Sequence, residues 1–192
     1  MKKILLITII TFFVNNIFSQ IKLESGDFQF LLDAKKICVE YDYSSMTVNK
    51  FNNENDFIVN EVGRLKSEER VEKWKSNWAF EKSALNTAFR DRLTAEFGRK
   101  YGILFEVDGL KDCRYKFKVK ILHYTFGSFL DCDYVDLKID IVESNSEKSV
   151  CLLNIKHACA SQPGQTTKPN SSYSMATAAS MIASLARKKI QR

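Results

Sequence analysis

Three stretches with alternating apolar and polar residues decide the fold of this chain: YKFKVKIL (115–122), YVDLKIDIVE (134–143) and VCLLNIKHA (150–158). A period of two is typical of a β-strand that has one buried face and one solvated face. In the first stretch Lys116, Lys118 and Lys120 alternate with apolar residues, and we expect these lysines on the solvated face. The three stretches follow one another closely, and we therefore predict an antiparallel meander.

The turn SNSEK (144–148) fixes the expected register of the last two strands, because it joins them directly. Matching the inward faces of the two strands gives opposed partners whose residue numbers sum to about 292. The predicted pairs are Ile141 with Cys151, Ile139 with Leu153, Leu137 with Ile155 and Val135 with His157.

Two further strands and a helix are expected before the meander. ICVEYDYSSMTV (37–48) alternates like a half-buried strand, and ILFEV (103–107) is an apolar run of strand length. From Trp78 to Tyr101 the apolar residues recur at steps of seven and four, which indicates an amphipathic helix. Gly102 suits the left-handed residue that ends such a helix.

A second helix is expected near the carboxyl end, after a loop rich in turn formers (161–174). Ser171 or Ser172 would cap it. The order strand, helix, four strands, helix predicts an α+β two-layer sandwich, with a mainly antiparallel sheet of about five strands and two helices packed on one face. We expect a single domain over residues 20–192, with a polar, partly helical insertion at about 51–77.

The beginning of the chain has the pattern of a secretory signal peptide (1–19). Lys2 and Lys3 precede a largely apolar run (4–14), and polar residues and the small Ser19 follow it. The apolar run is too short for a bilayer core of about 30 Å, which takes about 20 helical residues. We therefore expect an exported protein, periplasmic or secreted, that begins at Gln20 and keeps no transmembrane span.

Export places the five cysteines in an oxidising compartment, where disulfides form. No pair has C-x-x-C spacing, and the chain has two histidines, so the sequence indicates neither a zinc ribbon nor a thioredoxin-type redox pair. Extending the predicted register sets Asp133 opposite Cys159, with Cys132 beside it. Cys132 and Cys159 are thus the nearest candidates for a disulfide, and Cys151 is expected to be a buried free thiol.

A resemblance rests on the early strand, the helix ending FGRKYG, the meander and the small-residue helix MATAASMIASLA. The chain resembles small exported proteins of the Bacteroidetes whose role is unknown. Its element order is also similar to that of the N-terminal domain of TolB and related envelope lipoprotein domains. The resemblance covers about residues 36–190, without a lipobox cysteine or a propeller, and implies an interaction module of the cell envelope.

Few residues suggest chemistry. His123 and His157 could lie close together across the meander as a pair of metal ligands. Asp131, Asp133 and Asp136 lie close together at a hairpin end, where calcium could bind. His157 and Cys159 share a strand face but stand about 7 Å apart, too far for a catalytic pair. No motif for a nucleotide, a zinc protease or a serine hydrolase occurs, and no cofactor is indicated.

Two functions stay open on this basis. The favoured one is a non-catalytic exported or periplasmic module that binds an unknown envelope protein or surface. The net charge of +6 is too small to imply nucleic acid as a partner. The alternative is a small secreted hydrolase or metal-binding protein with an unrecognised site. A concave site that gathers His123, His157 and a carboxylate would favour the alternative, and a filled core with flat polar faces would favour the binding module.

Overall fold

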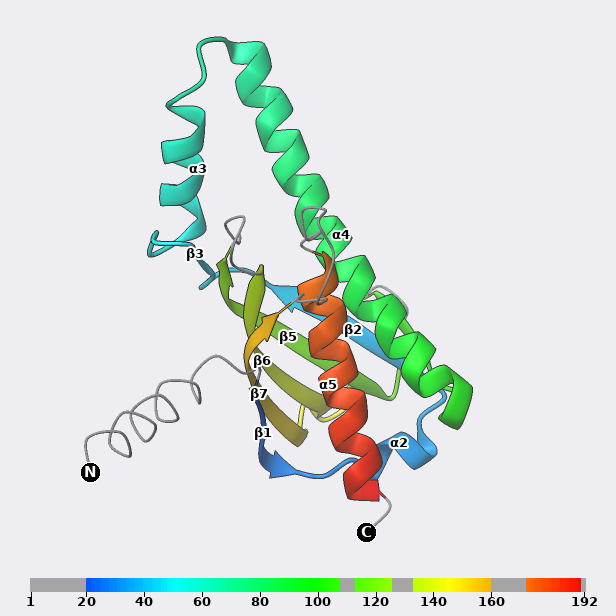
Figure 1. Cartoon of the computed structure of the whole chain (residues 1–192). Helices are drawn as coiled ribbons and strands as arrows, with labels where there is room; N and C mark the ends of the chain where they lie inside the picture. The colour runs from blue at the N-terminus through cyan, green and yellow to red at the C-terminus, as the bar shows by residue number, and fades with distance from the viewer. Residues whose placement is uncertain (1–19, 108–112, 126–132, 160–171, 191–192) are drawn as a thin grey trace, which may run out of the picture.

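A computed structural model describes residues 20–107, 113–125, 133–159 and 172–190 of the chain. These residues form an α+β fold in which helices cover one face of a sheet (Figure 1). The strands are β1 (Gln20–Gly26), β2 (Lys36–Asp42), β3 (Thr47–Val48), β4 (Leu104–Val107), β5 (Tyr115–Thr125), β6 (Tyr134–Glu143) and β7 (Ser149–Cys159). The helices are α2 (Phe30–Asp33), α3 (Glu54–Val62), α4 (Glu68–Tyr101) and α5 (Ser172–Ile190).

The sheet is mixed, which corrects the prediction of a mainly antiparallel sheet of about five strands. Of the seven strands in the described residues, six run in the order β1-β7-β6-β5-β2-β4, and the seventh, β3, pairs with β5. The meander β5-β6-β7 is antiparallel as predicted, and β1 extends it on β7. β2 pairs in parallel with both β4 and β5, and the long helix α4 makes the crossover that returns the chain for β4.

The predicted strand over 37–48 is two strands. The Asp42 side chain accepts a hydrogen bond from the Ser44 amide at 2.8 Å, and the Met46 amide donates to the Tyr43 carbonyl at 3.0 Å. These bonds form a turn between β2 and β3, because an aspartate that bonds the backbone two residues on favours a turn over a continued strand.

The helices α4 and α5 pack on each other and on the same face of the sheet (Figure 1). Among the helices of the described residues, none is both long and apolar enough to cross a membrane. The core between these helices and the sheet is filled by fully buried side chains, among them Phe89, Leu93 and Phe97 of α4, Met175 and Ile182 of α5, and Phe117, Ile139 and Leu153 of the sheet.

Helix α4 begins ten residues before the predicted start at Trp78, so the second half of the expected insertion belongs to it. The Ser67 side chain caps its first turn by accepting a hydrogen bond from the Arg70 amide, and Gly102 ends it with a left-handed φ of 68°. With 34 residues the helix is about 50 Å long. Its first turns therefore reach beyond the sheet and lie against α3.

The predicted register of the last hairpin is right in the middle of the two strands and wrong at both ends, since Val142 next to the turn pairs with Ser149. Ile141, Ile139 and Leu137 pair with Cys151, Leu153 and Ile155 as expected. Beyond them the register shifts, and Val135 pairs with Ala158 instead of His157. His157 has a left-handed φ of 52°, which the extra residue of a β-bulge can adopt. Ala158 takes the buried position that was predicted for His157.

Candidate functional site

The face of the sheet opposite α4 and α5 is called the outer face here. The lysines of β5 alternate with the buried Phe117 and Val119 and therefore point to this face, as predicted. Strands β2 and β6 carry acidic residues on the same side, at Glu40, Asp42 and Asp140. The outer face is thus a lattice of both charges across neighbouring strands.

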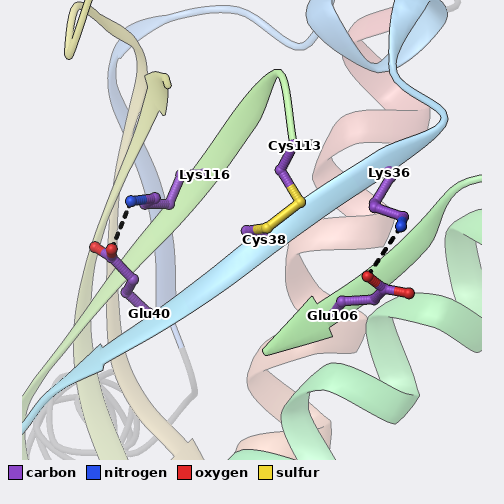
Figure 2. The surroundings of a disulfide bond; sticks show 6 residues. All are labelled: Lys36, Cys38, Glu40, Glu106, Cys113 and Lys116. Carbon is purple, nitrogen blue, oxygen red and sulfur yellow. Dashed lines mark hydrogen bonds and ion pairs between the residues drawn. A yellow bond between two sulfur atoms is a disulfide. The ribbon is translucent and has the colours of Figure 1, made fainter. Parts of the chain in front are cut away.

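Ion pairs connect these charges. Lys116 Nζ lies 2.6 Å from Glu40 Oε1, and the Lys116 side chain is four-fifths buried. Lys120 Nζ lies 3.9 Å from Asp42. Lys118 pairs with Glu147 in the turn after β6. Figure 2 shows the Lys116–Glu40 pair beside the Lys36–Glu106 pair, which joins β2 to β4 at 3.2 Å. The solvent-exposed ion pairs contribute little to the stability of the fold, so we regard these charges as a feature of the surface that a partner would meet.

A disulfide joins Cys38 of β2 to Cys113, just before β5 (Figure 2). Both residues are buried, and their Cα atoms lie 5.7 Å apart, within the normal range. The sequence analysis missed this bond because 75 residues separate the two cysteines and no local spacing links them. The disulfide locks the parallel pairing of β2 and β5 from the outer side.

A hollow of about 720 Å³ lies beside β2. The pairing of β4 with β2 ends at Val39 and Val107, whereas β2 continues to Asp42. The hollow's charged lining consists of Glu40, Asp42, Lys118, Lys120, Lys138 and Asp140.

Tyr41 forms part of the inner wall of this hollow. Its hydroxyl donates to the Asn86 carbonyl of α4 at 2.7 Å, and burial raises the pKa of this phenol well above 10. The Tyr41 side chain is therefore neutral and held in place. The charged residues that line the hollow all lie on the outer face of the sheet.

His123 lies at the far end of the outer face, where a register shift interrupts β5. Its Nδ1 lies 2.5 Å from the Thr47 hydroxyl, which also donates to the Leu122 carbonyl at 3.2 Å. Its Nε2 lies 2.6 Å from the Thr125 hydroxyl. Partial burial lowers the pKa of His123, which favours the neutral ring. Both ring nitrogens are thus held by hydroxyl groups, so neither points to an open metal or substrate position.

The pairing of His123 with His157 as metal ligands stays a prediction. The Tyr134 ring contacts both histidines, with centroid distances of 5.6 Å to His123 and 4.7 Å to His157. Asp136, the nearby carboxylate, accepts a hydrogen bond from the His157 amide at 2.7 Å. It therefore satisfies a backbone group released by the bulge. Sequence reasoning missed Tyr134 and grouped Asp136 only with possible calcium ligands, because the contacts of both residues depend on this bulge.

The other predicted site residues divide between described and undescribed parts of the chain. Asp131 and Cys132 lie outside the described residues. Asp133 is 7% exposed at the start of β6, and Cys159 is disulfide-bonded, so the pairing of Cys132 with Cys159 stays a prediction. Within the described ranges, no group of three His, Cys, Asp or Glu side chains is arranged to hold a metal ion.

Cys151 is a buried free thiol, as predicted. Burial raises its pKa to about 12. A thiol with so high a pKa is protonated at neutral pH and is a poor nucleophile.

The chain matches no protein-family model, and no curated protein is similar to it. Among solved structures it is similar to the PelC dodecamer from Paraburkholderia phytofirmans, with 10% identity, a TM-score of 0.46, and coverage of 88% of this chain and 97% of that chain. A variant of the same PelC gives a TM-score of 0.44 with the same identity and coverage. Likeness at this level supports no inference about assembly or activity.

Proposed function

We propose that this chain is an exported, non-catalytic module of the cell envelope that binds an envelope protein or surface through the outer face of its sheet. The observation that carries the proposal is the hollow beside β2, with three lysines and three acidic residues in its lining. A surface that displays both charges in fixed positions suits a polar partner with a complementary pattern, because charge complementarity favours the right partner and register.

The state of the polar side chains supports binding over catalysis. A general base or a metal ligand needs an accessible lone pair, and both nitrogens of His123 contact threonine hydroxyls. Asp136 is used by a backbone amide, and Cys159 is disulfide-bonded. These groups stabilise the end of the sheet, which accounts for them without a reaction.

Export is supported by the signal-like segment and by the cysteines. The Cys38–Cys113 disulfide is typical of proteins that fold outside the cytosol. The proposed resemblance to envelope domains points to the same compartment. We further propose that cleavage leaves Gln20 as the first residue, so that β1 keeps its full pairing with β7 from Gln20 opposite Lys156. N-terminal sequencing of the protein recovered from the envelope tests this, and an intact Met1 would contradict it.

Site-specific photo-crosslinking in the native envelope tests the binding face. A photoreactive residue at Lys138, which is exposed on the outer face, should capture a defined partner. The same residue at the exposed Lys188 of α5 is the matched control. Lys120 lines the hollow, so weaker capture from position 138 when Lys120 is replaced by Glu would support the proposal. Capture of the same partner from Lys188 but not from Lys138 would contradict it.

A further inference from the structure

A cluster of basic residues lies at the end of the molecule opposite α3. The helices α4 and α5 both end there, and α2 lies at the same end (Figure 1). Arg187 of α5 pairs with Glu96 in the last two turns of α4 at 2.8 Å, which holds the two carboxyl ends next to each other. We call this end of the molecule the basic end, after its five exposed basic residues: Lys35, Arg99, Lys100, Lys188 and Lys189.

A backbone hydrogen bond connects Lys35 to the end of α4. The amide of Leu104, two residues after the Gly102 that ends this helix, donates to the Lys35 carbonyl at 2.9 Å. The last turn of α4 carries Arg99 and Lys100. The basic residues of the three segments are therefore neighbours in the fold, although they are distant in sequence.

Few acidic residues balance these charges. Helix α5 contains no acidic residue. On α4, the carboxylate of Glu96 pairs with both Arg92 and Arg187, each at 2.8 Å, so it neutralises one of two guanidinium groups. Asp33 of α2 is an exposed acid at this end. Among the residues that the structure describes, no acid lies within ion-pair distance of any of the five exposed basic residues.

Helix dipoles account for only part of this pattern. Basic side chains in the last turn stabilise the negative end of a helix dipole, and this applies to both α4 and α5. It does not explain why apolar side chains are exposed at the same end. Leu32 of α2 is 56% exposed, and Leu104, whose amide bonds to Lys35, is 44% exposed. The basic end thus combines positive charge with accessible leucine side chains.

We infer that the basic end docks on the surface of a bilayer that contains anionic phospholipids. The negative potential of such a surface attracts basic residues, and the attraction increases with each basic residue near it. The exposed leucines favour a bilayer over a soluble polyanion, because apolar side chains can enter the boundary between headgroups and acyl chains. This contact is separate from the outer face and goes beyond the binding proposed for that face.

Vesicle sedimentation tests the contact. At low ionic strength, the protein with its native amino terminus should bind vesicles of equal parts phosphatidylglycerol and phosphatidylcholine at least about tenfold more tightly than vesicles of phosphatidylcholine alone. This gain should disappear in concentrated salt, because dissolved ions screen the attraction between exposed charges. Equal binding to both vesicles, or a gain that persists in concentrated salt, would overturn the inference.

Charge-removing variants locate the contact. The double variant Lys188→Gln, Lys189→Gln should weaken binding to the mixed vesicles about tenfold. The matched control is the double variant Lys73→Gln, Lys75→Gln, which removes two exposed lysines from the first half of α4. All four lysines are exposed, so both variants should keep the thermal transition of the parent in circular dichroism. Unchanged binding in the first variant, or an equal loss in the control, would overturn the inference.

Two further measurements exclude other contacts. Lys120→Gln removes a charge of the outer face and should leave vesicle binding nearly unchanged, whereas a loss as large as that in Lys188→Gln, Lys189→Gln would overturn the inference and place the contact on the outer face. Soluble polyglutamate represents an acidic protein. Tighter binding of polyglutamate than of the mixed vesicles, with the same dependence on Lys188 and Lys189, would also overturn the inference.

Discussion

The two faces of the sheet carry different side chains on the same strands: one face is apolar and buried, and the other is charged. On the core face, Phe117, Ile139 and Leu153 are fully buried under α4 and α5. On the outer face, neighbours of these residues carry charges that pair between strands. Cysteines follow the same division, because Cys151 is a free thiol of the core face and Cys38 forms a disulfide on the outer side. The comparison indicates that packing stabilises one face, whereas the other is available for recognition.

Removal of α5 should have the largest effect. Met175, Ala178, Ile182 and Ala186 are fully buried, and a chain that ends before Ser172 would expose the core face beneath them. Each large aliphatic side chain contributes about 1.5–3 kcal/mol, against a typical total stability of 5–15 kcal/mol. We expect loss of the cooperative thermal transition in circular dichroism. The exposed Lys188→Ala on the same helix is the control. A cooperative transition in the truncated protein would contradict this packing.

Adjacent residues of β5 compare the faces within one strand. Phe117→Ala should lower the free energy of unfolding by about 3–5 kcal/mol, because it leaves a cavity in the core. Lys118→Ala removes a solvated ion pair with Glu147 and should cost less than about 1 kcal/mol. Urea unfolding of both variants measures the difference. Similar losses in the two variants would mean that the outer face is as tightly packed as the core face.

The disulfide should be the main stabilising feature of the outer face. The double variant Cys38→Ala, Cys113→Ala should lose about 2–4 kcal/mol, because the bond closes a long loop in the unfolded chain. Urea unfolding under non-reducing conditions measures this loss. Breaking the solvated Lys120–Asp42 pair by Lys120→Ala provides the comparison, with an expected loss of about 1 kcal/mol or less. A double variant as stable as the parent would show that the disulfide has no stabilising role.

The smallest effect at neutral pH is expected from the ionisation of the Cys151 thiol. The pKa of its thiol is raised from 9.0 to about 12 in the folded state, so the unfolded protein binds fewer protons between these values. Stability from this group is therefore complete below pH 9 and is lost as the pH rises toward 12. Cys151→Ala should flatten the decline of stability above pH 9, relative to the parent protein.

Labelling gives a second measurement for Cys151. Alkylation at pH 8, followed by peptide mass spectrometry, should modify this residue in urea and leave it unmodified in the native protein. Rapid labelling of the native protein would contradict the burial of this thiol.

The sequence by itself determined which residues face the core and where several elements begin and end. Strand β6 has the predicted bounds, and α4 ends at Gly102 as expected, because alternation, helical spacing and a left-handed glycine are local properties of the chain. Matching the apolar faces also gave the register of the three central pairs of β6 and β7, although the pair next to the turn is shifted by one residue. The candidate site was predicted less well, because the register shifts beside His123 and His157 and the contacts of both rings with Tyr134 depend on how the strands pair.

Only the tertiary structure decided which elements lie side by side. The parallel pairing of β2 with β4 and β5, the Cys38–Cys113 disulfide and the basic end all join segments that are distant in sequence or belong to different elements. The local pattern of apolar residues indicates which face of a strand or helix is buried, but it does not indicate which other element packs against that face. The bulge at His157 has the same origin, because a shift of one residue in register depends on both strands at once and leaves the alternation of each nearly unchanged.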